Sequence, residues 1–173
     1  MPQIIKPPTT ITPTHLEPVT LFLGGSIEMG EAENWQDRLT NSLSEEDIAI
    51  FNPRRDDWDS TWIQHPDNPQ FSEQVNWELF AQDVADVICY YFDPKTKSPI
   101  TLMELGMYEG NHSSHPACSV VVYCTEEYWR FGNVKIVCDR YGINCVNNWD
   151  EFVQEIRKAI DKSQKYYFRR FDD

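Results

Sequence analysis

The residue best placed to do chemistry is a single carboxylate, Glu104, in residues 98–106, directly after a hydrophobic run. Ser98 is a suitable N-cap for a helix, and Pro99 suits the first helical position, where its missing N–H costs nothing. The preceding run, residues 87–92, is typical of a buried strand in a parallel sheet. Because ligands of open α/β sheets bind beyond the carboxyl ends of the strands, we expect Glu104, in the second turn of its helix, to face such a crevice.

The neighbours of Glu104 distinguish it from an ordinary helical glutamate, which is usually solvated. Met103, Leu105 and Gly106 surround it in the sequence. A carboxylate in such a segment is partly desolvated, which costs free energy unless the site uses it. We therefore predict a pKa for Glu104 above that of free glutamate.

A short glycine-containing turn follows the first predicted strand. Gly24, Gly25 and Ser26 favour either a tight strand-to-helix turn or a turn whose backbone N–H groups contact a ligand oxygen, and both interpretations stay open. The further glycines of a dinucleotide-binding fingerprint are absent from the sequence.

Other polar residues carry weaker signals. His112, His115 and Cys118 have a spacing that resembles part of a zinc site, but no second pair of ligands lies nearby, so we predict no metal. Asp86 is expected to hydrogen-bond the turn between a helix and a strand, and Glu78 could simply be a surface helix residue. No serine, histidine and aspartate are arranged around a nucleophile elbow.

The composition of the chain disfavours several classes of partner and location. The chain has 173 residues, 40% of them hydrophobic, and a formal net charge of −13. Such a charge disfavours nucleic acid and anionic membranes as partners, since phosphates need Lys and Arg. No apolar run approaches the roughly 18 residues of a membrane span, and the N-terminus lacks a signal-peptide core. An odd number of cysteines, five, fits a reducing cytoplasm better than a disulfide framework.

The hydrophobic pattern predicts one α/β domain in which strands alternate with helices. The expected strands are residues 19–23, 48–51, 87–92, 119–123 and 143–146, and the expected helices are residues 33–43, 71–85, the segment that carries Glu104, and 149–162. This order indicates a doubly wound, Rossmann-like parallel sheet of five strands with helices on both faces. Residues 54–70 form a long polar and aromatic loop, a kind that is usually functional.

The chain is expected to divide into three parts. Residues 1–18, rich in Pro and Thr, predict an extended arm outside the core, and residues 19–163 the catalytic domain. Residues 164–173 form an aromatic and basic tail, which either packs on a neighbouring subunit or finishes the last helix.

Five short motifs, taken together, resemble the nucleoside 2-deoxyribosyltransferase family. They are Leu23-Gly24-Gly25-Ser26-Ile27, Asn52-Pro53-Arg54-Arg55 with Trp58, Val75-Asn76-Trp77-Glu78, Ala85-Asp86-Val87-Ile88 and Met103-Glu104-Leu105-Gly106. The resemblance runs from about residue 21 to residue 142. Each motif is modest, whereas their order and spacing as a set are specific, and nearest to a transferase-like branch.

The resemblance implies an exchange of a 2-deoxyribosyl group between nucleobases, without metal or cofactor. Glu104 falls where the family has its nucleophile, which forms a covalent deoxyribosyl intermediate, so two inversions give retention. Glu78 falls where the family has an acid, usually Asp, that contacts the substrate and assists proton transfer to the leaving base. The partners implied are 2′-deoxynucleosides and free nucleobases.

The resemblance also implies a shared, water-excluding site. Phe22, Trp58 and Trp77 are expected to form walls that stack on a base and exclude water, which would otherwise turn transfer into hydrolysis. A neighbouring subunit is expected to supply a polar side chain from residues 127–133, with Asn133 the candidate, in a homo-oligomer such as a dimer or a trimer of dimers.

Some positions depart from well-known transferases. Phe22 replaces a common Tyr, and Ser98 replaces an Asp. A Ser at this second position contacts the 5′-phosphate in the related deoxynucleotide N-hydrolases, whose turn Gly25-Ser26 looks similar, although Glu28 here replaces a basic residue and would repel phosphate.

Two alternatives to the cytoplasmic transferase therefore stay open. One is a hydrolase of deoxynucleoside 5′-monophosphates that uses Glu104 with water as acceptor and holds the phosphate with Arg54 or Arg55 and with Ser98. The other is a non-catalytic nucleotide-binding sensor module, since this fold hosts many functions.

Overall fold

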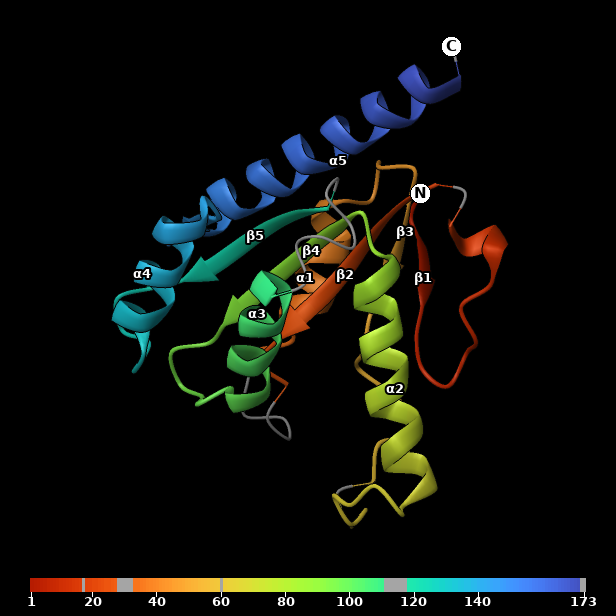
Figure 1. Ribbon diagram of the computed structural model, residues 1–173, viewed down its shortest axis with the longest axis vertical. Helices are drawn as coiled ribbons and strands as arrows, with labels where there is room; N and C mark the ends of the chain where they lie inside the picture. Colours follow the sequence, from red (N-terminus) through yellow and green to blue (C-terminus); the bar gives the residue numbers. More distant parts are fainter. Residues whose placement is uncertain (17, 28–32, 60, 111–117, 172–173) are drawn as a thin grey trace.

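The computed structural model describes residues 1–16, 18–27, 33–59, 61–110 and 118–171. Its sheet has six parallel strands in the order β1-β3-β2-β4-β5-β6 (Figure 1). The strands are β1 Gln3–Ile5, β2 Val19–Gly25, β3 Ile48–Phe51, β4 Val87–Phe92, β5 Ser119–Cys124 and β6 Asn144–Val146. The helices are α1 Trp35–Ser42, α2 Pro69–Val84, α3 Pro99–Gly110, α4 Phe131–Tyr141 and α5 Trp149–Phe171, with a short 3-10 helix at Pro13–Leu16. The predicted α/β class and parallel sheet are confirmed.

The sheet has one strand more than the sequence predicted, and the extra strand lies in the proline-rich segment. In β1, Gln3 pairs with Ala49 and Ile5 with Phe51, at the edge of the sheet. Ile5 and Ile11 are buried in the core. The expectation that residues 1–18 form an arm outside the core was therefore wrong, because these apolar side chains cover the edge of the sheet next to β3.

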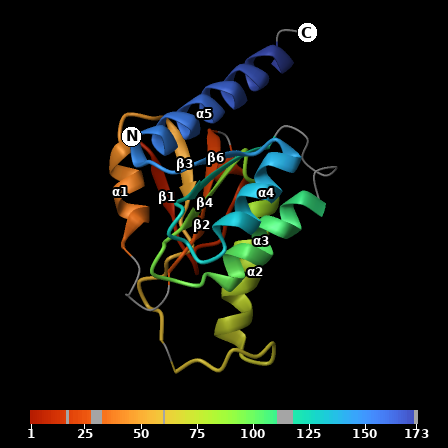
Figure 2. The ribbon, with the colours of Figure 1, turned by 90° about the vertical axis from the view of Figure 1, so that its left-hand side faces the viewer.

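Helices cover both faces of the sheet, as Figure 2 shows. On one face, Phe22, Ile88 and Tyr90 pack with Trp77 of α2 and Leu105 of α3. On the other face, the sheet packs against α1 and α5. The strand residues alternate between these two clusters, as the period of two requires. The chain thus forms three layers, with α2, α3 and α4 on the face that carries Glu104.

Two helices differ from the sequence-based expectation. α4 was not predicted. α5 continues to Phe171 instead of ending near residue 162, and it extends past the sheet toward the C-terminus (Figure 1). This outcome agrees with the second of the two expectations for residues 164–173, that they finish the last helix.

The strand order places a switch point between β2 and β4. β2 pairs with β3 on one side and β4 on the other, and the chain departs from the sheet in opposite directions at their carboxyl ends. At the amino ends, the Asp86 carboxylate accepts hydrogen bonds from the Thr20 N–H at 2.9 Å and the Thr20 hydroxyl at 2.8 Å. This contact fixes the turn before β4 against the start of β2, as expected for Asp86.

The glycines at the end of β2 are required by close packing. A Cβ on Gly24 would lie 2.6 Å from the Tyr90 ring, and a Cβ on Gly25 would lie 2.6 Å from the Tyr91 carbonyl oxygen. Gly25 also has a φ of 152°, which side-chain-bearing residues rarely adopt. The N–H of Ser26 donates to that Tyr91 carbonyl at 3.0 Å, so the structure supports a tight turn here.

All five cysteines are free thiols. Within the residues that the structure describes, no helix is both long and apolar enough to cross a membrane.

Candidate active site

The Glu104 helix begins at a network of three hydroxyl groups. Ser26 Oγ lies 2.5 Å from Ser98 Oγ, and Thr96 Oγ1 lies 2.9 Å from Ser26 Oγ and 2.8 Å from Ser98 Oγ. The Asp93 N–H donates to Ser26 Oγ at 3.0 Å. We call Ser26, Thr96 and Ser98 the hydroxyl trio, and all three are buried. The trio joins the end of β2 to the loop before α3.

Ser98 holds an uncommon backbone conformation. Its φ is 46°, in the left-handed region, which costs a non-glycine residue free energy unless its surroundings enforce it. The Ser98 carbonyl accepts the N–H of Leu102 at 3.1 Å, so it starts the hydrogen bonding of α3. The strain at Ser98 and the trio together fix where the helix that carries Glu104 begins.

Glu104 itself is buried, with 7% of its surface exposed. Its Oε1 accepts a hydrogen bond from Nε2 of Gln82 on α2 at 2.8 Å. The carbonyl oxygen of the same Gln82 amide accepts the Tyr90 hydroxyl at 2.9 Å. The uncharged amide of Gln82 thus holds the Glu104 carboxylate in place, and Tyr90 of β4 holds the amide in place.

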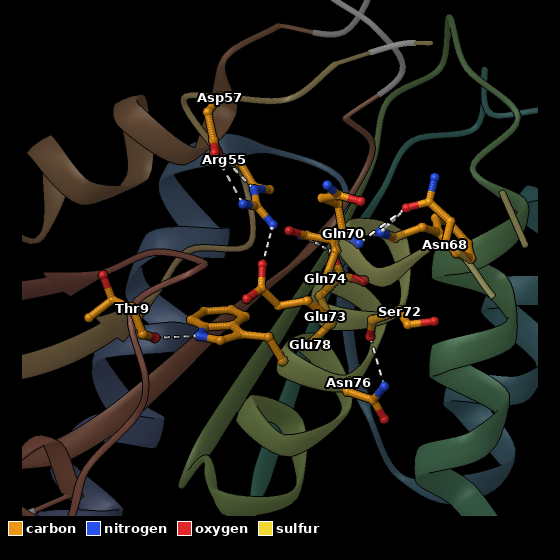
Figure 3. A network of polar contacts seen from close by, with 12 residues as sticks. Thr9, Arg55, Asp57, Asn68, Gln70, Ser72, Glu73, Gln74, Asn76 and Glu78 are labelled. Carbon is orange, nitrogen blue, oxygen red and sulfur yellow. Dashed lines mark hydrogen bonds and ion pairs between the residues drawn. The ribbon is translucent and has the colours of Figure 1, made fainter. Parts of the chain in front are cut away.

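Glu78 lies one turn earlier on α2 and has a similar partner. Gln74 Nε2 donates to Glu78 Oε1 at 2.6 Å and to the Pro53 carbonyl at 2.8 Å (Figure 3). Gln74, Glu78 and Gln82 recur every fourth residue, so they share one face of the helix. This face presents one carboxyl between two carboxamides, and it connects the turn after β3 with Glu104.

Both carboxyl groups hold protons more tightly than free glutamate. The pKa of Glu104 is raised to about 8, chiefly by burial and also by the negative charge of Glu78, against the opposing effect of the hydrogen bond from Gln82. Burial raises the pKa of Glu78 to about 7, against the hydrogen bond from Gln74. Between these values the pair holds one proton, so it consists of one carboxylate and one carboxylic acid. This agrees with the raised pKa predicted for Glu104.

The two arginines of the loop after β3 differ in their surroundings. The Arg55 guanidinium is buried and donates to both Asp57 oxygens, at 2.8 and 3.1 Å, and to Glu73 at 3.1 Å (Figure 3). These acids already neutralise Arg55. In contrast, Arg54 Nη1 is buried with no hydrogen-bond partner among the described residues. Arg54 is therefore the arginine with a donor left for a ligand.

The predicted aromatic walls lie in different places. Phe22 is fully buried in the core. The Trp77 indole N–H donates to the Thr9 carbonyl at 2.8 Å, and its ring packs edge-on against Phe51, so Trp77 attaches the N-terminal segment to α2. Trp58 is 40% exposed and contacts Trp62. Of the three, Trp58 alone combines an exposed ring with a place in the loop after β3.

The remaining residues that the sequence predicted for the site lie in several parts of the structure. Ser26 and Ser98 meet in the hydroxyl trio, and Gly25 precedes it. Asn133 is exposed on α4. Glu28, His112 and His115 lie outside the described residues. In the described part of the chain, no three His, Cys, Asp or Glu side chains are grouped so that they could hold a metal ion.

The sequence did not single out Gln74, Gln82 or Thr96. A signal was present in the spacing, since Gln74, Glu78 and Gln82 form a polar stripe beside the apolar Trp77 and Ala81. Carboxamides do not titrate, so composition and charge reveal nothing of their part in the site.

The structure is therefore an α/β protein with a parallel sheet, a switch point, and a pair of carboxyl groups on one face of the sheet, of which Glu104 is buried and Glu78 half-buried. The model of the family described as nucleoside 2-deoxyribosyltransferase like matches residues 18–128, well over half of the chain. The chain belongs to this family. A comparison with curated protein sequences gave no match. The family indicates an enzyme that acts on nucleosides, by glycosyl transfer or by hydrolysis.

Proposed function

We propose that the protein is a nucleoside 2-deoxyribosyltransferase in which Glu104 is the nucleophile and Glu78 the proton donor to the leaving base. The observation that carries this proposal is the pair itself. Glu104 is a buried carboxyl with a raised pKa, held through one oxygen, and it lies close enough to Glu78 for the charge of one to affect the other. Retaining displacement at a glycosidic carbon needs such a carboxylate and carboxylic acid.

The resting pair holds its shared proton on Glu104, because the pKa of Glu104 is about 8 and that of Glu78 about 7. In the first step this proton moves to Glu78, and an oxygen of the ionised Glu104 attacks C1′ of the deoxynucleoside and forms an ester bond. The glycosidic bond breaks, its electron pair goes to the base nitrogen, and the proton of Glu78 goes to the base. In the second step, a nitrogen of another base attacks C1′ and the ester bond breaks, so its electrons return to Glu104. The proton of the incoming base returns to Glu78, and the pair again holds one proton.

Burial of Glu104 supports transfer over hydrolysis. Glu104 is enclosed by α2, α3 and β4, and the loop with Trp58 is fixed to α2 through Arg55 and Glu73. A fixed loop with an exposed indole is suited to stack on a base and exclude water from the intermediate. A 2′-hydroxyl would crowd this site and destabilise the oxocarbenium-like transition state, so ribonucleosides are expected to be poor substrates.

One observation favours a second candidate, hydrolysis of deoxynucleoside 5′-monophosphates. Arg54 Nη1 is a buried donor with no partner among the described residues, which suits a phosphate oxygen. Against it, Arg55 is neutralised by Asp57 and Glu73, and the net charge of −13 opposes a dianionic substrate. The transferase therefore remains the better supported of the two.

The test is chromatography of the protein incubated with deoxyinosine, with and without adenine. Deoxyadenosine that forms only when adenine is present supports the transferase, and a trapped deoxyribosyl peptide should contain Glu104. Hypoxanthine and free deoxyribose at a rate independent of adenine would make the protein a hydrolase. Activity confined to the 5′-monophosphate would favour the second candidate and predicts that Arg54→Met abolishes it.

Glu104→Ala separates the enzyme from a non-catalytic binding module. We expect this variant to lose at least about 10³ in rate, the scale of losing a covalent nucleophile. Retention of more than a tenth of the activity would exclude Glu104 as the nucleophile. A wild-type protein without turnover, whose ligand affinity the substitution leaves unchanged, would instead indicate the binding module.

The proposal includes a homo-oligomer. Ile100, Met103 and Met107 form an apolar stripe on α3, with 57%, 52% and 41% of their surfaces exposed. These residues flank Glu104 on its own helix, so a second copy packed on them would close the site. Sedimentation of the wild type and of Met103→Glu tests this, and a wild-type monomer would contradict it.

A further inference from the structure

Among the residues that the structure describes, Gln82 is the side chain that hydrogen-bonds Glu104. The contact between Gln82 and Tyr90 shows which end of the Gln82 amide faces Glu104. The Tyr90 side chain is fully buried, and desolvation raises its pKa, so the hydroxyl keeps its proton. Among the described residues its partner is Gln82 Oε1, and a buried hydroxyl must donate somewhere. The carbonyl of the amide therefore faces Tyr90, and its NH2 group faces Glu104.

This arrangement makes the two oxygens of Glu104 unequal. Oε1 accepts from Gln82 at 2.8 Å, whereas in the described part of the chain no side chain or backbone group bonds Oε2. A donor that cannot accept stabilises the carboxylate over the acid, and it leaves one oxygen for another atom. The other titratable groups that face Glu104 are Glu78 from α2 and Tyr90 from β4, and neither supplies a cation.

We propose that Gln82, oriented by the Tyr90 hydroxyl, is a positioning residue that holds Glu104 Oε1 and directs Oε2 at the reacting carbon. The reacting carbon is taken from the proposed function, and in this respect the inference rests on it. The hydrogen bond between Gln82 and Glu104 does not depend on that function. Gln82 lies between Tyr90 and Glu104, and its carboxamide has no titratable proton. Its hydrogen bond favours the ionised form of Glu104 in surroundings that favour protonation.

Two variants test the proposal. Gln82→Leu removes the donor with similar volume, and Tyr90→Phe leaves the donor but frees the amide to rotate. Gln70→Leu is the matched control, because it makes the same change on an exposed position of α2. NMR titration of protein labelled at the glutamate δ-carbon gives the pKa of Glu104, whose signal is identified by its loss in Glu104→Gln.

We expect Gln82→Leu to raise the pKa of Glu104 by about one unit or more and Tyr90→Phe to raise it less. In the exchange assay, kcat of Gln82→Leu should fall by about 10- to 100-fold at neutral pH, with its acid limb shifted upward and KM little changed. A Glu104 pKa that both variants leave unchanged would overturn the proposal. The titration needs no substrate, so it decides the role of Gln82 even where the exchange assay has refuted the transferase.

Discussion

Replacement of Glu104 by Gln should make the protein more stable and inactive. In the folded state burial raises the pKa of Glu104 from 4.5 to about 8. The folded protein therefore binds this proton more tightly than the unfolded chain does, and its stability falls as the pH rises from 4.5 to about 8. Glutamine has nearly the same shape, can accept the same Gln82 hydrogen bond, and pays no such cost.

The magnitude follows from the pKa. At about 1.4 kcal/mol per unit, the difference between 4.5 and about 8 corresponds to roughly 5 kcal/mol for ionising Glu104 in the fold. Relaxation and water entry reduce such costs in proteins, so we expect Glu104→Gln to gain ~2–3 kcal/mol in free energy of unfolding at alkaline pH. The gain should be near zero at acid pH, where Glu104 is protonated in both states.

Urea denaturation between about pH 5.5 and pH 9 measures this difference, since the lower limit stays above the isoelectric point of about 4.6. Glu45→Gln, at an exposed position after α1, is the matched control and should be neutral throughout. Glu78→Gln should also stabilise, and the double variant should gain less than the sum because each change removes the same repulsion. A Glu104→Gln variant no more stable at pH 9 than at pH 5.5, relative to wild type, would refute the reasoning.

Two further predictions concern the elements around the site. Arg55→Met should cost ~1–2 kcal/mol and speed proteolysis within residues 57–68, because it removes the pairs to Asp57 and Glu73 and the stacking on Trp62; limited proteolysis with wild-type kinetics would contradict this. Gly25→Ala should cost more than ~2 kcal/mol, since its Cβ would lie 2.6 Å from the Tyr91 oxygen and 2.8 Å from the Trp35 ring. Gly106→Ala is the control in thermal unfolding, because its Cβ meets no atom within 4 Å, and it should stabilise α3 by up to ~1 kcal/mol; equal losses at both glycines would show the close contact at Gly25 to be unimportant.

The sequence was sufficient where local pattern decides the structure. Residues 87–92 form a strand with the predicted bounds, because six apolar residues in a row suit a strand buried on both faces. Glu104 was found because an acid among apolar residues is conspicuous. Its pKa followed from the same observation.

The sequence was insufficient where a distant segment decides the structure. β1 has three residues between prolines, too few for a periodic signal, and it is a strand because β3 accepts it. Trp77 looked like a wall for a base, but Thr9 takes its N–H. Gln82 acquires its part in the site through Tyr90 and Glu104, which are brought to it by the fold.

The edge strand β1 also affects the order in which native contacts can form while the chain is being synthesised. Its partner β3 ends at Phe51, and Trp77, which binds the Thr9 carbonyl, comes later still. The segment around β1 therefore waits during synthesis for more than half of α2 before the hydrogen bond between Trp77 and Thr9 can form. Until then the open edge of β3 and the apolar Ile5 are exposed to other nascent chains, so a translational pause before residue 77 should favour chaperone capture.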